Sequence, residues 1–439
     1  PEMATAFLSI SSYMSAAPLN PSYKLKEYEF YLQDLMPKIV IVEKDSQNPA
    51  VEAAKNLGIE ICEIKKIDNA PAGIFNLYNK TTNFELATEN NEALVLHTSG
   101  TTSRPKVVPL TNKNIFSSAI NISNSLELSS QDHCYNIMPL FHIHGLIAVL
   151  SSSINAGASV YASSGFNALK FLETANKESI TWYSGVPTMH QAILMRVKKY
   201  PKLAEELSLR FIRSSSASLP PAVFDELKKI FKTTVIEAYG MTEATHQMTS
   251  NPMPPEKQKA GFVGKPAGPE VCIMDAQGNK LDSGVDGEVC IRGDNVTNGY
   301  ENNEEANKTA FINGWFRTGD QGHFDDEGYL KISGRLKEII NRGGEKVSPL
   351  EVDNILMEHK AVEQVVTFAV KDNLLGEAIG VAIVLKSGID CNETDIKNYA
   401  RKHLADFKIP KYIRFLEEIP KGATGKLQRI GLAEKLCLE

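Results

Sequence analysis

The sequence contains few cysteines, and those it has follow no metal-binding or disulfide pattern. Six cysteines are scattered over 439 residues, and no two of them form a Cys-x-x-Cys pair. This spacing fits neither a zinc site nor a disulfide framework. We therefore expect a cytoplasmic protein that works in a reducing environment.

The sequence also lacks an excess of charge of one sign and a long apolar run. Lys and Arg number 47 against 53 for Asp and Glu, so the net charge is −6. This balance argues against nucleic acid as a partner. The longest apolar stretch, residues 146–162, is interrupted by Ser151–Ser153 and by Asn155, so we expect no membrane insertion.

The two ends of the sequence carry no address signal. The N-terminus has no signal-peptide charge pattern, and the C-terminal Cys-Leu-Glu is not a peroxisomal signal. The chain opens with Pro1 instead of methionine, which is typical of a fragment or a processed product.

The alternation of strand and helix patterns predicts an α/β fold. A chain of 439 residues is too long for one core, so we expect two or more domains. The β-rich segments 37–43 and 161–165 are each followed by a helical pattern, at 48–58 and 168–177. This order favours parallel sheets covered by helices. From 261 to 329, Gly, Asp and Asn separate short strands, which indicates an antiparallel β-rich subdomain.

A further unit begins near Leu336. Its first helix, in residues 348–360, has Ser348 as N-cap, Pro349 at the first helical position and Glu351 closing a capping box. The sequence then predicts two strands and a helix, at residues 363–370, 380–388 and 393–407. We expect an α+β domain of about a hundred residues.

The stretch "HTSGTTSRPKVVPL", residues 97–110, has the composition of a phosphate-binding loop. Flexible backbone, hydroxyl donors and a lysine can together surround anionic oxygens. It is not a Walker A loop, because four residues after Gly100 come Pro105, Lys106 and Val107, without the second glycine and the hydroxyl. A polar turn between two strands is the alternative.

Six segments in order make the chain similar to the adenylate-forming superfamily, which includes acyl-CoA synthetases, luciferases and the adenylation domains of peptide synthetases. They are "TSGTTSRPKVV", "PLFHIHG", "EAYGMTEA", "GWFRTGD", "GRLKEIINRGGEKVSPLEVD" and "IPKGATGKLQR". The resemblance implies a large AMP-binding domain, residues 1–336, and a small mobile domain, residues 337–439. Family members usually carry several dozen residues before the segment similar to "AFLSISSYMSAAPLNP", so we expect the start of the large domain to be missing.

The resemblance implies a reaction in two halves that uses ATP, Mg²⁺ and coenzyme A. A carboxylate attacks the α-phosphate of ATP to give an acyl-adenylate and pyrophosphate, and a thiol then displaces AMP. By resemblance the β- and γ-phosphates are bound by Thr98, Ser99, Gly100, Thr101, Thr102 and Lys106. The loop has Ser103 and Val107 where most of the family has glycine. Serine at the first position is a feature of the oxalate-activating branch, and Val107 has no explanation.

The resemblance assigns the rest of the nucleotide site to two segments. Tyr239 would stack on the adenine, Thr242 would contact the α-phosphate and Glu243 would hold Mg²⁺, a hard cation that prefers carboxylate ligands. Asp320 would bind the ribose hydroxyls. Arg335 would add a second ribose or phosphate contact.

The resemblance assigns the moving parts to the small domain. Lys426 would complete the adenylation site as a point charge. Lys337 would be the hinge, and a rotation there would present Gly343, Gly344 and Glu345 to coenzyme A.

The acyl-binding segments are polar, which favours a small dicarboxylate such as oxalate as the substrate. A second carboxylate would be bound by His142, Ser215, Ser216 and His246. The binding would use hydrogen bonds and the charge of a readily charged histidine. The run "MTEATHQMTSNP" is similar to that of oxalyl-CoA synthetases. In the family at large, His142 is a gate beside the acyl-adenylate.

Several alternatives stay open. A medium-chain or aromatic, 4-coumarate-like acid–CoA ligase has the same adenylation motifs. A peptide-synthetase domain is less favoured, because that branch usually offers an aspartate where this chain has "PLFHIHG". A luciferase-type oxygenase is a rare offshoot. A non-catalytic nucleotide-binding relative would not need Glu243, Arg335 and Lys426 together. Monomer and homodimer are both open.

Overall fold

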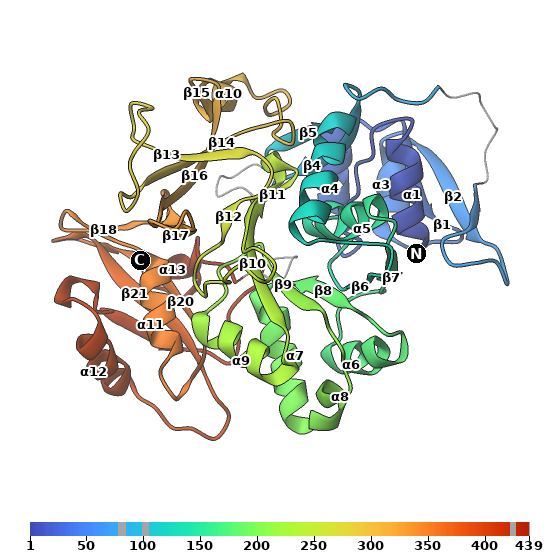
Figure 1. The fold of residues 1–439 in the computed structure, drawn as a ribbon. Helices are drawn as coiled ribbons and strands as arrows, with labels where there is room; N and C mark the ends of the chain where they lie inside the picture. The colour runs from blue at the N-terminus through green and yellow to red at the C-terminus, as the bar shows by residue number, and fades with distance from the viewer. Residues whose placement is uncertain (78–84, 99–104, 422–426, 439) are drawn as a thin grey trace.

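The computed structural model describes residues 1–77, 85–98, 105–421 and 427–438 (Figure 1). Its strands form sheets of three, seven, five, five and two strands. The C-terminal sheet, orange to red in Figure 1, lies beside the central sheet and away from the blue N-terminal helices. No helix in the described part of the chain has both the length and the apolar character needed to cross a bilayer.

The largest sheet has the strand order β12–β11–β10–β9–β8–β6–β7. Its strands are β6 (His133–Asn136), β7 (Ser159–Ala162), β8 (Trp182–Gly185), β9 (Phe211–Ser214), β10 (Thr234–Met241), β11 (His246–Ser250) and β12 (Lys265–Pro266). From β7 to β10 neighbouring strands are parallel, while β11 and β12 are antiparallel. The predicted parallel core is therefore confirmed.

Hydrophobic clusters cover both faces of this sheet. Because successive side chains of a strand point to opposite faces, Trp182 and Phe211 join one cluster while Tyr183 and Ile212 join another. Each fully buried large side chain contributes about 1.5–3 kcal/mol to folding. Near the sheet lie the helices α4 (Asn112–Ser125), α5 (Ser152–Asn155), α6 (Ala168–Lys177), α7 (Pro187–Lys199), α8 (Pro201–Glu205) and α9 (Pro221–Phe231), and the π-helix η1 (His144–Ser151).

The N-terminal region contributes a small sheet and a ribbon. The sheet contains β1 (Ile39–Glu43), β2 (Glu60–Lys66) and β3 (Phe75–Leu77), and its helices are α2 (Leu25–Leu35) and α3 (Pro49–Asn56). Helix α1 (Glu2–Ser11) packs against the two-stranded ribbon of β4 (Glu92–His97) and β5 (Val107–Thr111). The ribbon is antiparallel, and its two strands flank the predicted phosphate loop.

The predicted β-rich subdomain is confirmed as an antiparallel sheet. It contains β13 (Glu270–Met274), β14 (Gly287–Arg292), β15 (Phe311–Ile312), β16 (Trp315–Phe324) and β17 (Leu330–Arg335), with helix α10 (Glu304–Ala310). Every strand pair in it is antiparallel.

The C-terminal residues form the predicted α+β unit. It contains β18 (Ile340–Arg342), β19 (Glu345–Val347), β20 (Val362–Asp372), β21 (Gly376–Leu385) and β22 (Tyr412–Phe415), with α11 (Pro349–Met357), α12 (Glu393–His403) and α13 (Leu432–Lys435). Its strands and helices have their own hydrophobic cluster, which includes Ile340, Val381 and Ile396. The boundary between residues 336 and 337 stays a prediction.

Two local predictions in this unit need correction. Ser348 accepts a hydrogen bond from the Glu351 amide as an N-cap, but the Glu351 carboxylate binds Lys408 Nζ at 2.6 Å and does not close a capping box. The helix predicted over residues 393–407 ends at His403, and a 3₁₀ turn, Asp406–Lys408, follows. At Glu351 a contact outside the helix replaces the local pattern.

Candidate active site

Three predicted nucleotide-binding side chains meet where strands β10, β16 and β17 come together. Asp320 on β16 lies directly opposite Arg335, the last residue of β17. Tyr239 Oη donates to Asp320 Oδ2 at 2.5 Å, and Arg335 Nε donates to Oδ1 at 2.9 Å. Burial, reinforced by the Asp320 carboxylate, raises the pKa of Tyr239 well above its usual value. The phenol therefore stays protonated and holds the carboxylate in place.

Glu243 lies in a buried turn between β10 and β11. The turn is a 3₁₀ helix, Thr242–Ala244, and the Glu243 side chain is 6% exposed. Tyr300 Oη donates to Glu243 Oε1 at 2.8 Å. Burial raises the pKa of Glu243, and this effect is opposed by its own backbone amide, by Tyr300 and by nearby cations. A positive ion at this carboxylate would relieve the cost of its burial.

Lys106 approaches Glu243 from the ribbon. Its Nζ lies 4.2 Å from the centre of the Tyr300 ring, within the range of a cation–π contact. Burial lowers the pKa of Lys106, the Glu243 carboxylate raises it, and Lys337 and Arg335 lower it further. Arg335 and Lys337 thus add positive charge in the surroundings of Lys106, which suits a polyanion. We call the following set the nucleotide cluster: Lys106, Tyr239, Glu243, Tyr300, Asp320 and Arg335.

The donor set of the nucleotide cluster fits a magnesium ion held mainly by a nucleotide. Mg²⁺ in such sites is bound by one or two carboxylates together with substrate phosphates and water. Glu243 supplies one buried carboxylate. The described residues contain no group of three or more His, Cys, Asp or Glu that could hold a metal in the absence of a nucleotide.

The phosphate loop is described only at its ends. Thr98 donates its backbone N–H to the Lys106 carbonyl at 2.9 Å, which closes the loop at its base. Ser99, Gly100, Thr101 and Thr102 lie outside the described residues, as does Lys426. Thr242 opens the turn of Glu243, and its carbonyl accepts the Thr245 amide.

A second group of polar side chains lies on the face of the central sheet that η1 covers. His144 Nε2 is 2.6 Å from Ser184 Oγ, and His144 Nδ1 is 3.0 Å from Ser216 Oγ. The rings of His144 and His246 are 4.8 Å apart. Arg213 Nη1 donates to Ser184 Oγ at 3.3 Å. We call these five residues the acyl cluster: His144, Ser184, Arg213, Ser216 and His246.

Arg213 is the positive charge of the acyl cluster. It is fully buried, and Nη2 donates to Gln247 Oε1 at 3.1 Å. In the described part of the chain it forms no ion pair with a carboxylate, and Nε has no hydrogen-bond partner. Burial lowers its pKa to about 9. A buried guanidinium without an acidic partner is costly, so this position favours an anionic ligand.

Unusual backbone positions the acyl cluster. Ser216 and His246 have φ angles of 72° and 92°, in the region that non-glycine residues rarely adopt. The pairing of β10 with β11 shifts at Gly240, where an added Cβ would lie 1.6 Å from the His246 carbonyl oxygen. Only glycine leaves room for the His246 backbone there. Such strain is typical of functional sites.

The four residues predicted for the acyl pocket have different surroundings. Ser216 and His246 belong to the acyl cluster. Ser215 follows β9, and its buried hydroxyl has no hydrogen-bond partner among the described residues. His142 is half-buried, and its Nδ1 accepts the backbone N–H of His144 at 3.2 Å. This bond favours a neutral His142 with its proton on Nε2.

Four residues of the two clusters were not predicted from the sequence: Tyr300, His144, Ser184 and Arg213. The second histidine of "FHIHG" and the arginine before "SSS" were the available signals. Ser184 and Tyr300 carried none, because they lie in segments without a motif.

The predicted hinge and coenzyme A segments lie in turns. Lys337 is exposed in the turn between β17 and β18. Gly343 and Gly344, with φ angles of 62° and 93°, form the two-residue connection of the hairpin β18–β19, and Glu345 begins β19. The structure shows a tight hairpin at these residues.

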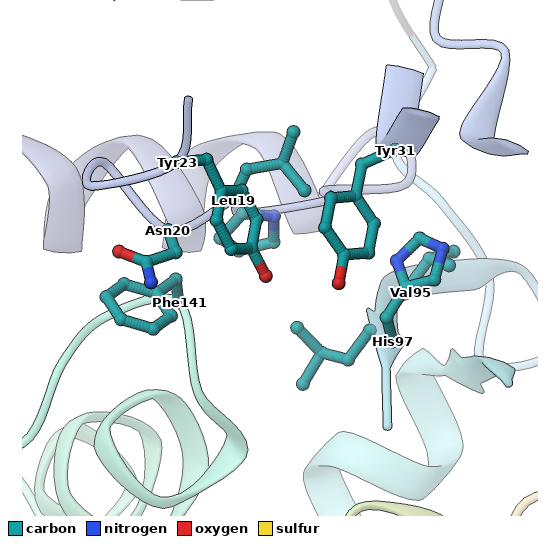
Figure 2. Close-up of a pocket in the computed structure, with 9 residues that line it drawn as sticks. Leu19, Asn20, Tyr23, Tyr31, Val95, His97 and Phe141 are labelled. Atoms are coloured by element: carbon teal, nitrogen blue, oxygen red, sulfur yellow. The ribbon is translucent and has the colours of Figure 1, made fainter. Parts of the chain in front are cut away.

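A cavity lies behind the start of the phosphate loop, and Figure 2 shows its aromatic lining. His97, the last residue of β4, pairs with Asp34 of α2 at 2.9 Å. The ring of Tyr31 meets the His97 ring edge-on, with centroids 4.7 Å apart. Because Thr98 follows directly, helix α2 anchors the strand from which the phosphate loop begins.

Comparison with known proteins gives matches over nearly the whole chain. Residues 1–301 match the family model of AMP-binding enzymes, and residues 351–426 match that of the AMP-binding enzyme C-terminal domain. The chain is 46% identical over 437 residues to the oxalate–CoA ligase of Arabidopsis thaliana, covering 98% of this chain and 85% of that protein. It is 43% identical to the oxalate–CoA ligase of Saccharomyces cerevisiae, covering 99% and 84%.

Solved structures give the same picture. ATP-bound MatB from Rhodopseudomonas palustris matches with a TM-score of 0.87 at 25% identity, covering 99% of this chain and 91% of that one.

Proposed function

Because the chain belongs to the family of AMP-binding enzymes, we propose that it joins a small dicarboxylate, oxalate above all, to coenzyme A. The reaction class itself is that of the family. The protein is an AMP-forming acid–thiol ligase that uses ATP, Mg²⁺ and coenzyme A and acts on a carboxylic acid through an acyl-adenylate. The proposal concerns the acid and the roles of individual residues.

The nucleotide cluster supports the first half of the reaction. Asp320 and Arg335 would bind the ribose, and Tyr239 would pack on the adenine. Lys106 would bind phosphate oxygens beside Thr98, and Thr242 would face the α-phosphate. Glu243 would hold the magnesium ion, which supplies positive charge to the phosphates when bound. The cations offset the repulsion between a carboxylate and a triphosphate.

The composition of the acyl cluster supports a dicarboxylate as the acid substrate. Its side chains are polar, most of them are buried, and one of them is a guanidinium. A medium-chain or aromatic acid would place apolar atoms against the polar groups that face the ligand, and each donor left without an acceptor there costs about 1–3 kcal/mol. A second carboxylate would accept hydrogen bonds from the side chains that border it. His142, Ser215, Ser216 and His246 would share this carboxylate, with His142 also serving as the gate.

The relatives' names support the same choice. Two proteins that this chain resembles at 46% and 43% identity are oxalate–CoA ligases. Both alignments span more than four fifths of those proteins, so the acyl segments are included. A non-catalytic nucleotide-binding relative would have no use for a buried group of polar side chains such as the acyl cluster.

A panel of acids tests the substrate. The chain is incubated with ATP, Mg²⁺, coenzyme A and one of oxalate, malonate, octanoate or coumarate, and pyrophosphate release and the thioester product are measured. We expect oxalate to give the highest kcat/KM. Highest activity with octanoate or coumarate would favour the alternative ligases, and no release with any acid would favour a binding protein.

The two-domain mechanism is a second part of the proposal. Residues 1–336 would form the AMP-binding domain, and residues 337–439 would rotate about Lys337. Lys426 would complete the site for adenylation, and the hairpin with Gly343, Gly344 and Glu345 would face coenzyme A after rotation. The exposed turn at Lys337 supports this hinge, since few contacts would be lost there.

A proline at the hinge tests the rotation. Lys337→Pro should keep pyrophosphate release and lose thioester formation, because the backbone at this turn could no longer change its angles. Full thioester turnover by this variant would place the hinge elsewhere.

We also propose a cytoplasmic enzyme that is a monomer or a homodimer and has no nucleic acid partner. All six cysteines are free thiols, including the exposed Cys437, which suits a reducing compartment. The net charge of −6 offers no excess of positive charge for a nucleic acid.

A further inference from the structure

We propose that Arg213 selects for a second carboxylate through a directed chain of hydrogen bonds that ends on the Ser216 hydroxyl. The chain runs from Arg213 through Ser184 and His144 to Ser216. This inference rests on the proposed function, because it assumes that the acyl cluster receives an acid. It assigns Arg213 and Ser184 as positioning residues that act through His144.

The direction of the chain is fixed at Arg213. A guanidinium can only donate hydrogen bonds, so Ser184 Oγ accepts from Nη1 at 3.3 Å. The Ser184 proton is then best used toward His144 Nε2, which is 2.6 Å away. If Nε2 also donated to Ser184, the Ser184 hydroxyl would still carry its own proton. None of the hydrogen bonds that Ser184 makes among the described residues would then give that proton an acceptor.

The imidazole of His144 extends the chain with the same donor-to-acceptor direction. A neutral histidine has one donor nitrogen and one acceptor nitrogen. With Nε2 accepting from Ser184, the ring proton is on Nδ1, which donates to Ser216 Oγ at 3.0 Å. Ser216 Oγ therefore accepts inside the chain, and its own proton is left for an acceptor on a ligand.

The burial of the four residues agrees with this direction. Arg213, Ser184 and His144 are fully buried, whereas Ser216 is only partly buried. The chain thus starts in the interior and ends at its most accessible member. The φ angle of 72° at Ser216 turns the backbone at this end. The ring of His246 lies 4.8 Å from that of His144, the residue that bonds to Ser216.

The chain gives a physical reason for selecting an acid with two carboxylates. A hydroxyl donor with a buried positive charge behind it favours a negatively charged acceptor. Oxalate offers a second carboxylate at this position, and acetate offers a methyl group. With acetate the Ser216 proton would have no partner on the ligand, and unmet polar groups discriminate strongly between ligands.

Breaking the chain in the middle is the main test. Ser184→Ala separates Arg213 from His144 without touching a residue that we place against the substrate. We expect kcat/KM for oxalate to fall about 10- to 100-fold and that for acetate to change less than about threefold, with the KM for ATP unchanged. Equal losses with both acids, or no loss with oxalate, would overturn the proposal.

Three matched variants sharpen this test. Ser214→Ala removes a buried hydroxyl that has no hydrogen-bond partner among the described residues and lies on the opposite face of β9, so it should leave the oxalate-to-acetate ratio unchanged. Ser184→Thr keeps the hydroxyl and should restore most of the ratio. Ser216→Gly suits the φ angle and should lower the ratio as Ser184→Ala does.

The double variant Ser184→Ala/Ser216→Gly separates a chain from two independent contacts. If the residues act in one chain, the second change should cost little once the first is made. Independent contacts would give losses that multiply, and that result would contradict the proposal. The double variant remains informative even if each single substitution lowers activity by perturbing the local structure.

Nitrogen NMR of His144 gives a readout that does not depend on turnover. We expect the Nδ1-protonated tautomer in the wild type and a loss of that preference in Ser184→Ala. An Nε2-protonated ring in the wild type would reverse the chain and refute it. If the wild type prefers acetate or a longer acid, the proposed function is wrong. If the wild type prefers oxalate but Ser184→Ala has no effect, only the proposed hydrogen-bond chain is wrong.

Discussion

The nucleotide cluster and the acyl cluster are only three residues apart in sequence, at Glu243 and His246, yet they treat charge in opposite ways. In the nucleotide cluster both carboxylates have partners, since Asp320 binds Arg335 and Glu243 binds Tyr300. In the acyl cluster the guanidinium of Arg213 has only neutral partners among the described residues. In the first cluster cations and carboxylates occur together, whereas in the second the buried cation has no acidic partner among the described residues.

We expect selectivity for the acid to reside in the acyl cluster. A balanced cluster of cations and carboxylates can bind a nucleotide whatever acid follows, so its loss should affect every substrate equally. An unbalanced buried cation distinguishes ligands by their charge. Substitutions in the two clusters should therefore produce different kinetic signatures.

The largest effect is expected at Glu243. Glu243→Gln removes the carboxylate that suits a magnesium ion, so pyrophosphate release should fall on the order of 100-fold or more with every acid. Tyr300→Phe is the control, because it keeps the ring beneath Lys106 and removes only one hydrogen bond. It should cost a few-fold. A Glu243→Gln loss confined to oxalate would show that Glu243 acts on the acid and not on the nucleotide.

The second effect is expected at Asp320. Asp320→Asn keeps the shape but loses the charge that Arg335 binds, so the KM for ATP should rise about tenfold and the KM for oxalate should change little. Tyr239→Phe, which removes only the 2.5 Å bond to Asp320, should give a smaller rise. Steady-state kinetics with each substrate varied in turn measures both. A rise in the KM for oxalate alone would move Asp320 to the acyl side.

The third effect is expected at His246 and has the opposite signature. His246→Asn should lower kcat/KM for oxalate about fivefold and leave the KM for ATP unchanged. Asparagine is chosen because it tolerates positive φ better than alanine does. A change in the KM for ATP equal to that for oxalate would show that the two clusters are one unit.

The nucleotide cluster could be predicted because its members lie in short motifs. Asp320 and Arg335 belong to neighbouring strands of one antiparallel sheet, so their spacing in the sequence already places them opposite each other. Tyr300 escaped prediction because it lies in a segment without a motif. Its role comes from a contact 57 residues away in the chain.

The acyl cluster could be predicted only in part, because the order of the strands assembles it. His144 begins η1, Ser184 lies on β8, Arg213 lies on β9 and His246 begins β11. A pattern within one segment cannot show which of these side chains face each other. The capping box at Ser348 failed for a related reason, since Lys408 competes for the Glu351 carboxylate. Local rules hold until a distant partner offers a stronger contact.

The smallest effect on turnover is expected at Glu237, which belongs to neither cluster. Its side chain lies on the face of the central sheet opposite Arg213, and Oε1 accepts the Leu219 amide at 3.0 Å. Burial raises the pKa of Glu237 from 4.5 to about 8. The folded protein therefore holds a proton that the unfolded chain has lost, and stability should fall as the pH rises from about 4.5 to 8.

Glu237→Gln is neutral at every pH and should remove this slope. Urea unfolding at pH 5 and pH 8 measures it: we expect the wild type to lose on the order of 2–4 kcal/mol that the variant keeps. Turnover at pH 7 should change less than about twofold, because both clusters are untouched. A wild type that gains stability relative to the variant as the pH rises would mean that Glu237 is ionised in the fold. Arg213 could then no longer be regarded as the uncompensated charge of this sheet, because a buried anion on the neighbouring strand would attract it, and the contrast between the clusters would weaken.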